Sequence, residues 1–335
     1  MDQVILGKTK IVVNKNGFGA LPIQRIEMKD AVYLLQKAFY NGMNYFDTAR
    51  WYSDSEEKLG AAFSWIREKI IISTKTGAQT ADDFWKDLDT SLQNLKTDYI
   101  DIYQFHNPSF CPKPGDESGL YEAMLKAKKQ GKIRFIGITN HSQSVAKEAI
   151  ESKLYDTLQF PFCYLASDED LQLVKAAKTN DMGFIAMKAL SGGLITDSKA
   201  AYAYLSQFYH VAPIWGIQRE TELDAFISYQ ESPPRLTEEM KVKIEGDRKE
   251  LSGNFCRGCG YCMPCPAEIE INNCARMSLM LRRAPADNLL SQEWQEKMKN
   301  IENCIHCNQC KEKCPYGLDT PELLQKNYED YQTFL

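Results

Sequence analysis

The chain has 335 residues, of which 44% are hydrophobic and 25% are charged, and its formal net charge is −5. This balance allows a large buried core and excludes a disordered chain. No basic surface is available to hold a polyanion, so we expect no nucleic-acid partner. The first residues lack the pattern of a signal peptide, and no apolar run is long enough to cross a membrane. We therefore expect a cytoplasmic protein without a membrane partner.

A β-hairpin is expected at the start of the chain. Val4–Leu6 and Ile11–Val13 are short apolar runs that flank a polar turn. This hairpin could cover the N-terminal end of the barrel that the following segments predict.

Eight short apolar runs alternate with amphipathic stretches of helical length between about residues 17 and 230. This alternation is typical of βα units around a parallel sheet. Eight strands, each followed by a helix, favour an α/β fold of the (β/α)8 TIM-barrel type over an open doubly wound sheet. The predicted strands are Phe18–Leu21, Met43–Asp47, Lys69–Thr74, Tyr99–Phe105, Phe135–Thr139, Thr157–Phe162, Gly183–Met187 and Ala212–Trp215.

The character of the chain changes after the last of these units. Paired prolines in Glu231–Arg235 predict a boundary, and a polar helix over Thr237–Leu251 is expected to follow. Asn273–Lys299 contains mostly helix-forming residues, which predicts a small, mainly helical second domain. We therefore expect a barrel, a linker helix and a cysteine-rich domain over residues 1–232, 233–252 and 253–335.

Nine of the eleven cysteines lie after residue 255. In a cytosolic protein, dense and regular cysteines indicate a metal site more often than a disulfide framework, because the cytosol keeps thiols reduced. The second group has the spacing C-x2-C-x2-C-x3-C-P, which is that of a ferredoxin-type [4Fe–4S] site. The first group is one residue shorter, and its first three cysteines precede those of the second by 48 residues.

In two-cluster ferredoxins, the distant fourth cysteine of each motif binds the other cluster. We therefore expect two [4Fe–4S] clusters with crossed ligands, although the shortened first motif leaves each fourth ligand open. Structural zinc is the alternative, since paired C-x2-C motifs also build zinc sites, but the third cysteine and the Cys-Pro pair favour clusters. The expected ligand sets are Cys256, Cys259, Cys262 and Cys314 for the first cluster, and Cys304, Cys307, Cys310 and Cys265 for the second.

Four polar residues lie at or just after the C-terminal ends of predicted barrel strands, where TIM barrels place their active sites. They are Asp47, Tyr52, Lys75 and His106. A Tyr beside a buried Lys becomes a better acid because the ammonium stabilises the phenolate, and a carboxylate keeps the Lys charged. Each residue alone would more often be structural, but four at successive strand ends favour a site that donates a proton to a carbonyl oxygen.

Residues 1–230 resemble the aldo-keto reductase family. The resemblance implies NAD(P)H-dependent reduction of a small carbonyl substrate, with Tyr52 as general acid, Lys75 and Asp47 tuning it, and His106 orienting the carbonyl. The cysteine-rich half is similar to the subset of this family that carries a ferredoxin-type domain. The matching stretches are Asn44–Gly60, Ile71–Lys75, Asp98–Pro108 and Gly131–Asn140 in the barrel, and Cys259–Pro266 in the second half.

The same resemblance implies the cofactor contacts. Thr139, Asn140 and Gln159 would hold the nicotinamide carboxamide, Met187 would lie beside its ring, and the turn that starts at Gly216 would hold the phosphates. No G-x-G-x-x-G motif follows a strand, which argues against a separate Rossmann domain.

The choice between NADH and NADPH depends on a few positions after the last strand. Glu222 stands where NADPH-using members place an Arg for the 2′-phosphate, and Phe226 where an Asn usually meets the adenine. An acidic residue repels a phosphate, which favours NADH, but Arg219 could compensate. Farther along the loops, Trp51 is one of several aromatics that could line a substrate pocket, although such residues more often serve packing.

The role of the clusters stays open at this point. Nicotinamide delivers two electrons as hydride, a cluster passes one at a time, and no flavin motif is visible to convert between them. The clusters could stabilise the fold or dock a partner, or they could exchange electrons with an external ferredoxin or flavoprotein. Alternatively, the chain could be a redox sensor or electron-transfer subunit that binds nicotinamide without turnover, which the intact catalytic set argues against.

Overall fold

The computed structural model describes residues 2–251, 255–283 and 287–335. The chain forms two compact units. The first runs to Ala189 and resumes over Lys199–Leu236, and the second comprises Leu190–Ser198 and the chain from Thr237 onward. The expected border between linker and cysteine-rich domain, at residues 252 and 253, lies outside the described residues. Within the described ranges, no helix has the length and apolarity needed to cross a lipid bilayer.

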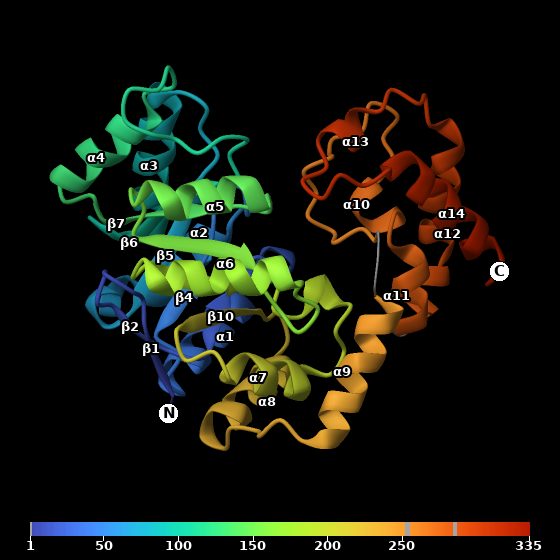
Figure 1. Ribbon diagram of the computed structural model, residues 1–335, viewed down its shortest axis with the longest axis horizontal. Helices are drawn as coiled ribbons and strands as arrows, with labels where there is room; N and C mark the ends of the chain where they lie inside the picture. The colour runs from blue at the N-terminus through green and yellow to red at the C-terminus, as the bar shows by residue number, and fades with distance from the viewer. Residues whose placement is uncertain (1, 252–254, 284–286) are drawn as a thin grey trace. The chain divides into compact units, whose positions relative to one another are not determined.

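The first unit is a closed barrel of eight parallel strands, as predicted (Figure 1). Each strand pairs with the next one in the chain, and the last strand closes on the first. The ends of the strands differ from the predicted ends by at most two residues. The barrel strands are β3 (Gly17–Gly19), β4 (Tyr45–Asp47), β5 (Ile71–Thr76), β6 (Ile100–His106), β7 (Ile133–Thr139), β8 (Thr157–Pro161), β9 (Gly183–Met187) and β10 (Val211–Gly216).

A helix follows each barrel strand, and its apolar stripe determines which face is buried. In α1, the residues Ala31, Leu34, Leu35 and Ala38 recur at helical spacing and are all buried. The two short 3-10 segments of this unit are η1 (Pro22–Arg25) and η2 (Ser64–Lys69). The helices are α1 (Met28–Tyr40), α2 (Ser55–Phe63), α3 (Ala81–Leu95), α4 (Leu120–Lys129), α5 (Gln143–Ser152), α6 (Asp168–Thr179), α7 (Ser198–Ser206) and α8 (Glu220–Glu231).

The predicted N-terminal hairpin is confirmed as β1 (Gln3–Ile5) paired antiparallel with β2 (Val12–Asn14). Its inward-facing apolar side chains are buried against the interior of the barrel, which closes the N-terminal end, as expected, whereas Ile5 and Val12 are exposed. The opposite end, where the strands finish, is therefore the end at which polar side chains gather. The buried cluster contains Val4, Leu6, Ile11 and Val13 of the hairpin and Tyr45, Ile102, Ile185, Ala212 and Ile214 of the strands.

The second unit is helical in its described residues, which confirms the predicted class. The expected polar helix begins after Thr237, whose side chain accepts a hydrogen bond from the backbone N–H of Met240. Cys274, which lies outside both cysteine motifs, is fully buried in the core of this unit. The elements are η3 (Ser191–Gly193), α9 (Glu238–Glu250), α10 (Ile271–Cys274), α11 (Met277–Arg283), η4 (Asp287–Leu290), α12 (Gln292–Lys299), η5 (Asn300–Asn303), α13 (Gln309–Glu312) and α14 (Thr320–Gln332).

Candidate functional site

Pairing between the strands brings Asp47, Lys75 and His106 to the C-terminal end of the barrel. Asp47 of β4 is opposite Ser73 of β5, and Lys75 of β5 is opposite Gln104 of β6. Side chains alternate between the two sides of a strand, so residues two apart on one strand share a face. His106, two residues beyond Gln104, ends β6 on that same face.

A buried ion pair forms the centre of this group. Lys75 Nζ lies 2.7 Å from Asp47 Oδ2 and donates a second hydrogen bond, of 2.5 Å, to the backbone oxygen of Thr48. The two side chains are 1% and 3% exposed. Burial lowers the pKa of Lys75, and the Asp47 carboxylate works against that shift. The pair therefore acts as one unit of almost cancelling charge.

Sequence reasoning missed two polar neighbours of this pair. Ser73 Oγ donates to Asp47 Oδ1 at 2.6 Å, and Gln104 Nε2 donates to Gln159 Oε1 at 2.9 Å. The signal that could have found them is the two-residue period of a strand. Ser73 precedes Lys75 by two residues, and Gln104 precedes His106 by two, so both share a face with a predicted site residue.

Tyr52 lies in the turn after β4, next to the ion pair. Lys75 Nζ is 5.2 Å from the centre of the Tyr52 ring. In the structure, burial and secondarily Asp47 raise the pKa of Tyr52, so both oppose the effect expected of Lys75. Tyr52 consequently keeps its proton at neutral pH and can donate it.

His106 faces Tyr52 edge-on, with 5.7 Å between the ring centres. Burial, and secondarily Lys75, hold the pKa of His106 well below its usual value, so the imidazole is neutral at neutral pH. Trp51 lies over the same imidazole at 4.8 Å and is 55% exposed. Gly77 makes room for it, because a Cβ atom at Gly77 would be 1.8 Å from Trp51 Cζ2. Trp51 therefore contacts both solvent and the His106 imidazole.

Three of the residues expected to contact nicotinamide, Thr139, Gln159 and Met187, lie on the next strands at the same end of the barrel. Thr139 of β7 is opposite both His106 of β6 and Gln159 of β8. The Thr139 hydroxyl is buried and donates a long 3.6 Å contact to the sulfur of Met187. Gln159 Nε2 donates to Asp47 Oδ2 at 3.2 Å, which ties this position to the ion pair.

Asn140 lies one residue beyond β7, where its amide shapes the following loop. Its Nδ2 donates to the backbone oxygen of Pro108 at 2.8 Å, and its Oδ1 accepts from the backbone N–H of Ser142 at 2.7 Å. Gly216 ends β10, opposite Gly19 of β3.

At the start of α8, the carboxylate of Glu222 occupies the backbone N–H groups that precede the helix. The Glu222 carboxylate accepts hydrogen bonds from the backbone N–H groups of Gln218 (3.0 Å) and Arg219 (3.1 Å). It also pairs with the Arg219 guanidinium at 2.5 Å. Phe226, expected where a base would lie, is 2% exposed and stacks on Trp215 at 4.5 Å. Its ring is therefore part of the core.

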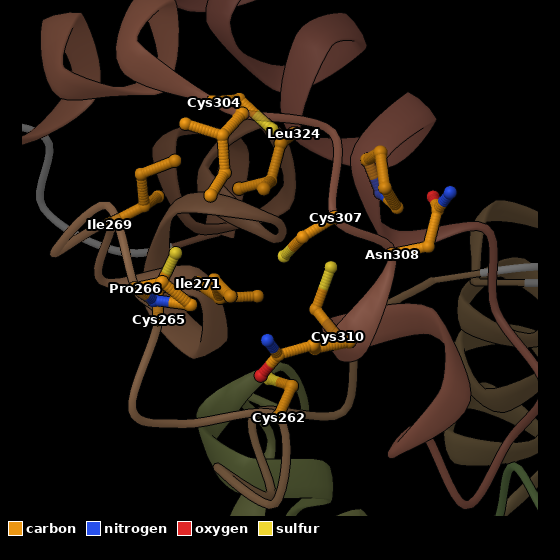
Figure 2. Close-up of a pocket in the computed structure, with 13 residues that line it drawn as sticks. Cys262, Cys265, Pro266, Ile269, Ile271, Cys304, Cys307, Asn308, Cys310 and Leu324 are labelled. Carbon is orange, nitrogen blue, oxygen red and sulfur yellow. The ribbon is translucent and has the colours of Figure 1, made fainter.

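The eight motif cysteines surround two cavities in the second unit. One cavity is lined by Cys256, Cys259, Cys262 and Cys314. The other is lined by Cys262, Cys265, Cys304, Cys307 and Cys310, and Figure 2 shows the sulfur atoms of Cys307 and Cys310 turned toward its centre. Each cavity thus combines cysteines from both motifs.

The donor chemistry of these cavities suits a multinuclear cluster. All eleven cysteines are free thiols. Among the residues that the structure describes, no three His, Cys, Asp or Glu side chains converge closely enough for a single ion. Burial, followed by the neighbouring Cys256, raises the pKa of Cys262 to about 12, so this thiol needs a bound cation to lose its proton. Thiols spread around a space fit a cubane better than one tetrahedral zinc ion.

Two family models match the chain. Residues 15–225 match the Aldo/keto reductase family, and residues 255–319 match a 4Fe-4S dicluster domain. These ranges contain the polar strand ends and the two cysteine cavities, respectively.

Individual proteins are similar to the barrel part. L-galactose dehydrogenase of Arabidopsis thaliana is 30% identical over 211 residues, which cover 57% of this chain and 66% of that protein. The match thus spans slightly less than two thirds of that relative. A 6-dehydroglucose reductase of Novosphingobium aromaticivorans is 33% identical over 132 residues, 34% of this chain and 42% of that protein. Among solved structures, the holo form of aldo-keto reductase AKR11C1 from Bacillus halodurans shares the fold, with a TM-score of 0.64, 21% identity and coverage of 74% and 96%.

Proposed function

Because the chain belongs to the aldo/keto reductase family, we propose that its barrel uses NADH or NADPH to reduce the carbonyl group of a small aldehyde, ketone or sugar to an alcohol. The observation that carries this proposal is the convergence of Asp47, Tyr52, Lys75 and His106 at the open end of the barrel. The names of the plant dehydrogenase and the bacterial 6-dehydroglucose reductase support the inclusion of sugars among candidate substrates.

The geometry supports a division of labour among these side chains. Tyr52 donates its proton to the carbonyl oxygen, and the raised pKa keeps that proton available. The neutral His106 donates an N–H hydrogen bond that orients the same oxygen. The Lys75 ammonium stabilises the phenolate that remains, and Asp47 holds the ammonium in place. A bound nicotinamide would supply the hydride.

The residues at the next strand ends fit a nicotinamide. The buried Thr139 hydroxyl has a weak sulfur acceptor at 3.6 Å and is able to bond a carboxamide instead. We infer that Thr139, Asn140 and Gln159 hold the carboxamide, that Met187 lies beside the ring, and that the turn after Gly216 holds the phosphates.

The position of the Glu222 carboxylate at the start of α8 supports a preference for NADH. Glu222 already uses the backbone N–H groups of Gln218 and Arg219, which a 2′-phosphate would otherwise bind. Replacement by Glu222→Gln should free Arg219 and raise kcat/KM for NADPH several-fold, with little change for NADH. An unchanged ratio of the two kcat/KM values would contradict this preference.

We further propose that the second unit holds two [4Fe–4S] clusters with crossed ligands. Cys256, Cys259, Cys262 and Cys314 would bind the first, because these four line one cavity. Cys265, Cys304, Cys307 and Cys310, which line the other, would bind the second. The free state of the thiols suits a reducing, cytoplasmic location.

The surface of the second site supports electron exchange with an external ferredoxin or flavoprotein. Cys307 is exposed, and the neighbouring Ile305 is 64% exposed. The exposure of this cysteine brings the proposed cluster close to the surface, where a partner protein can approach it. Replacement by Ile305→Glu should slow cluster reduction by such a partner and leave reduction by dithionite unchanged.

The proposed activity is tested with protein purified without oxygen. NADH and NADPH oxidation is followed with a panel of aldehydes, ketones and sugars. The wild type should show carbonyl-dependent oxidation, and Tyr52→Phe should lower kcat by about 10²–10⁴-fold. The control Tyr40→Phe changes a Tyr that is 68% exposed and should have no effect. Nicotinamide binding without any turnover would instead support the redox-sensor alternative.

A further inference from the structure

A buried arginine lies beside the first cysteine cavity. Arg276, just before α11, is 6% exposed. Its guanidinium is enclosed by two glycine backbones: a Cβ atom on Gly258 would be 2.3 Å from Nη1, and one on Gly192 would be 3.0 Å from it. Nη2 donates to the backbone oxygen of Gly192 at 2.6 Å and to the sulfur of Met280 at 3.0 Å. The loop between Cys256 and Cys259 is thus shaped to admit this group.

Among the side chains that the structure describes, no carboxylate pairs with Arg276. Burial lowers the pKa of Arg276, and Cys256 is the group whose charge raises it again. A buried cation is costly unless an anion compensates it. Because the guanidinium packs against Gly258, between two cysteines of the first ligand set in our assignment, the first cluster would be the compensating anion.

The second cavity differs in this respect. Its described lining includes Ile269, Ile271 and Leu324, and it contains neither Lys nor Arg. The first cavity is lined by Arg257, which lies over the ring of Tyr316 at 4.4 Å, and Arg276 packs against Gly258 in the loop between two of its cysteines. Positive charge is therefore concentrated on one of the two cluster sites.

We propose that Arg276 raises the reduction potential of the cluster bound by Cys256, Cys259, Cys262 and Cys314, so that an electron entering this unit is stabilised there. This inference rests on the cluster assignment proposed above. One electron from an external donor converts [4Fe–4S]2+ to [4Fe–4S]+ and adds one negative charge to a centre that four thiolates already make negative. A fixed buried cation stabilises the reduced form more than the oxidised form.

The test is a potentiometric titration of the anaerobically purified full-length protein with dithionite, followed by electron paramagnetic resonance. Replacement by Arg276→Gln should shift one of the two cluster waves to lower potential and leave the other in place. Arg276→Lys, which keeps the charge, should restore most of the wild-type value. The matched control Arg282→Gln removes an exposed charge, paired with Asp330, from the adjacent helix and should move neither wave.

A second variant keeps Arg276 in place, in case its removal prevents cluster assembly. Met280→Glu puts a carboxylate where the Met280 sulfur now meets the guanidinium and should lower the same wave, whereas Met280→Gln should not. Cys307→Ser marks the wave of the second cluster. Iron is counted on each variant. Fewer than two clusters in the wild type would overturn the assignment itself. If two clusters are present and neither Arg276→Gln nor Met280→Glu changes the reduction potential of either one, the role of Arg276 is overturned.

Discussion

The mechanism that we propose depends on the protonation states of Tyr52 and His106. Both side chains are kept neutral by burial, because their charged forms would lose solvation. A neutral phenol can donate a proton, and a neutral imidazole can orient an oxygen. The ammonium of Lys75 lies beside the phenol, but its ion pair with Asp47 leaves little net charge at the site.

The raised pKa of Tyr52 gives a prediction for the pH profile. Because the folded-state pKa lies above the ordinary value near 10, the phenol stays protonated from neutral pH to beyond pH 10. The kcat for carbonyl reduction should therefore be flat between about pH 7 and pH 9 and decline only at higher pH. A profile of kcat against pH, at saturating nicotinamide, checks this. A decline that begins below pH 8 would show that Lys75 lowers the pKa after all.

Trp51 gives a prediction for substrate binding. Gly77→Ala places a Cβ atom 1.8 Å from the present position of Trp51 Cζ2, so the indole must leave His106. We expect Gly77→Ala and Trp51→Ala to change KM for the carbonyl substrate in the same direction, by several-fold, with KM for nicotinamide unchanged. The control Gly246→Ala has no atom within 4 Å of its added Cβ and should change neither constant. Opposite changes in the two variants would contradict a shared cause.

The positions of the four proposed catalytic residues could be predicted from the sequence, whereas their environment could not. Each lies at or just after a strand end, and a TIM barrel places all strand ends together. The direction of the Tyr52 shift depends on burial and on how closely Asp47 pairs with Lys75, which chain order does not show. The position of Gln104 in the site was not predicted, because a single glutamine inside a strand belongs to no recognisable motif.

At the scale of elements, buried polar bonds hold the site between helices and strands. The Glu56 carboxylate of α2 accepts hydrogen bonds of 2.7 Å from Thr74 of β5 and from Ser91 of α3, and it pairs with Arg50 at 2.7 Å. Glu56 is fully buried. This one carboxylate therefore fixes α2 against β5, the strand that carries Lys75.

Removal of this charge should destabilise the barrel. Glu56→Gln leaves Arg50 without its partner and weakens the bonds from Thr74 and Ser91, so we expect a loss of about 3 kcal/mol in the free energy of unfolding. Chemical denaturation measures it. Glu57→Gln removes an exposed carboxylate from the neighbouring position and should cost less than about 0.5 kcal/mol. Equal effects of the two variants would contradict the bonding role of Glu56.

The elements themselves were predictable because their patterns are local. Alternation of short apolar runs with amphipathic stretches identified all eight barrel strands. Some boundary errors arise where an apolar residue, such as Leu21 or Met43, lies outside the strand, and others where a strand continues without an apolar residue. The strand that carries Lys75 was expected to end at Thr74, but it extends to Thr76, since backbone pairing with β6 does not require apolar side chains.

At the scale of the whole molecule, one chain joins a reductase barrel to a unit with two cysteine cavities. The segment Leu190–Ser198, which separates β9 from α7, belongs to the second unit. Arg276 and Arg283 hold it there through the backbone oxygens of Gly192 and Leu194, at 2.6 and 2.9 Å. No local pattern predicts such a long-range contact, whereas the cysteine spacing did predict which thiols gather.

The crossed ligand sets predict how cysteine variants change the metal content. Cys256→Ser should lose about four irons per chain and leave the second cluster in place. The control Cys274→Ser alters a buried cysteine outside both motifs and should retain the wild-type iron content. Iron and sulfide analysis of anaerobically purified variants checks this. Loss of iron in Cys274→Ser at an intact fold would contradict the assignment.

The proposed protein combines carbonyl reduction with two iron–sulfur clusters. Metal analysis of the wild-type protein tests this combination most directly. Iron, acid-labile sulfide and zinc are measured per chain after purification without oxygen. We predict about eight irons and about eight sulfides per chain, with little zinc. About four irons would contradict the cluster role of the shortened first motif, and stoichiometric zinc with little iron would contradict both clusters.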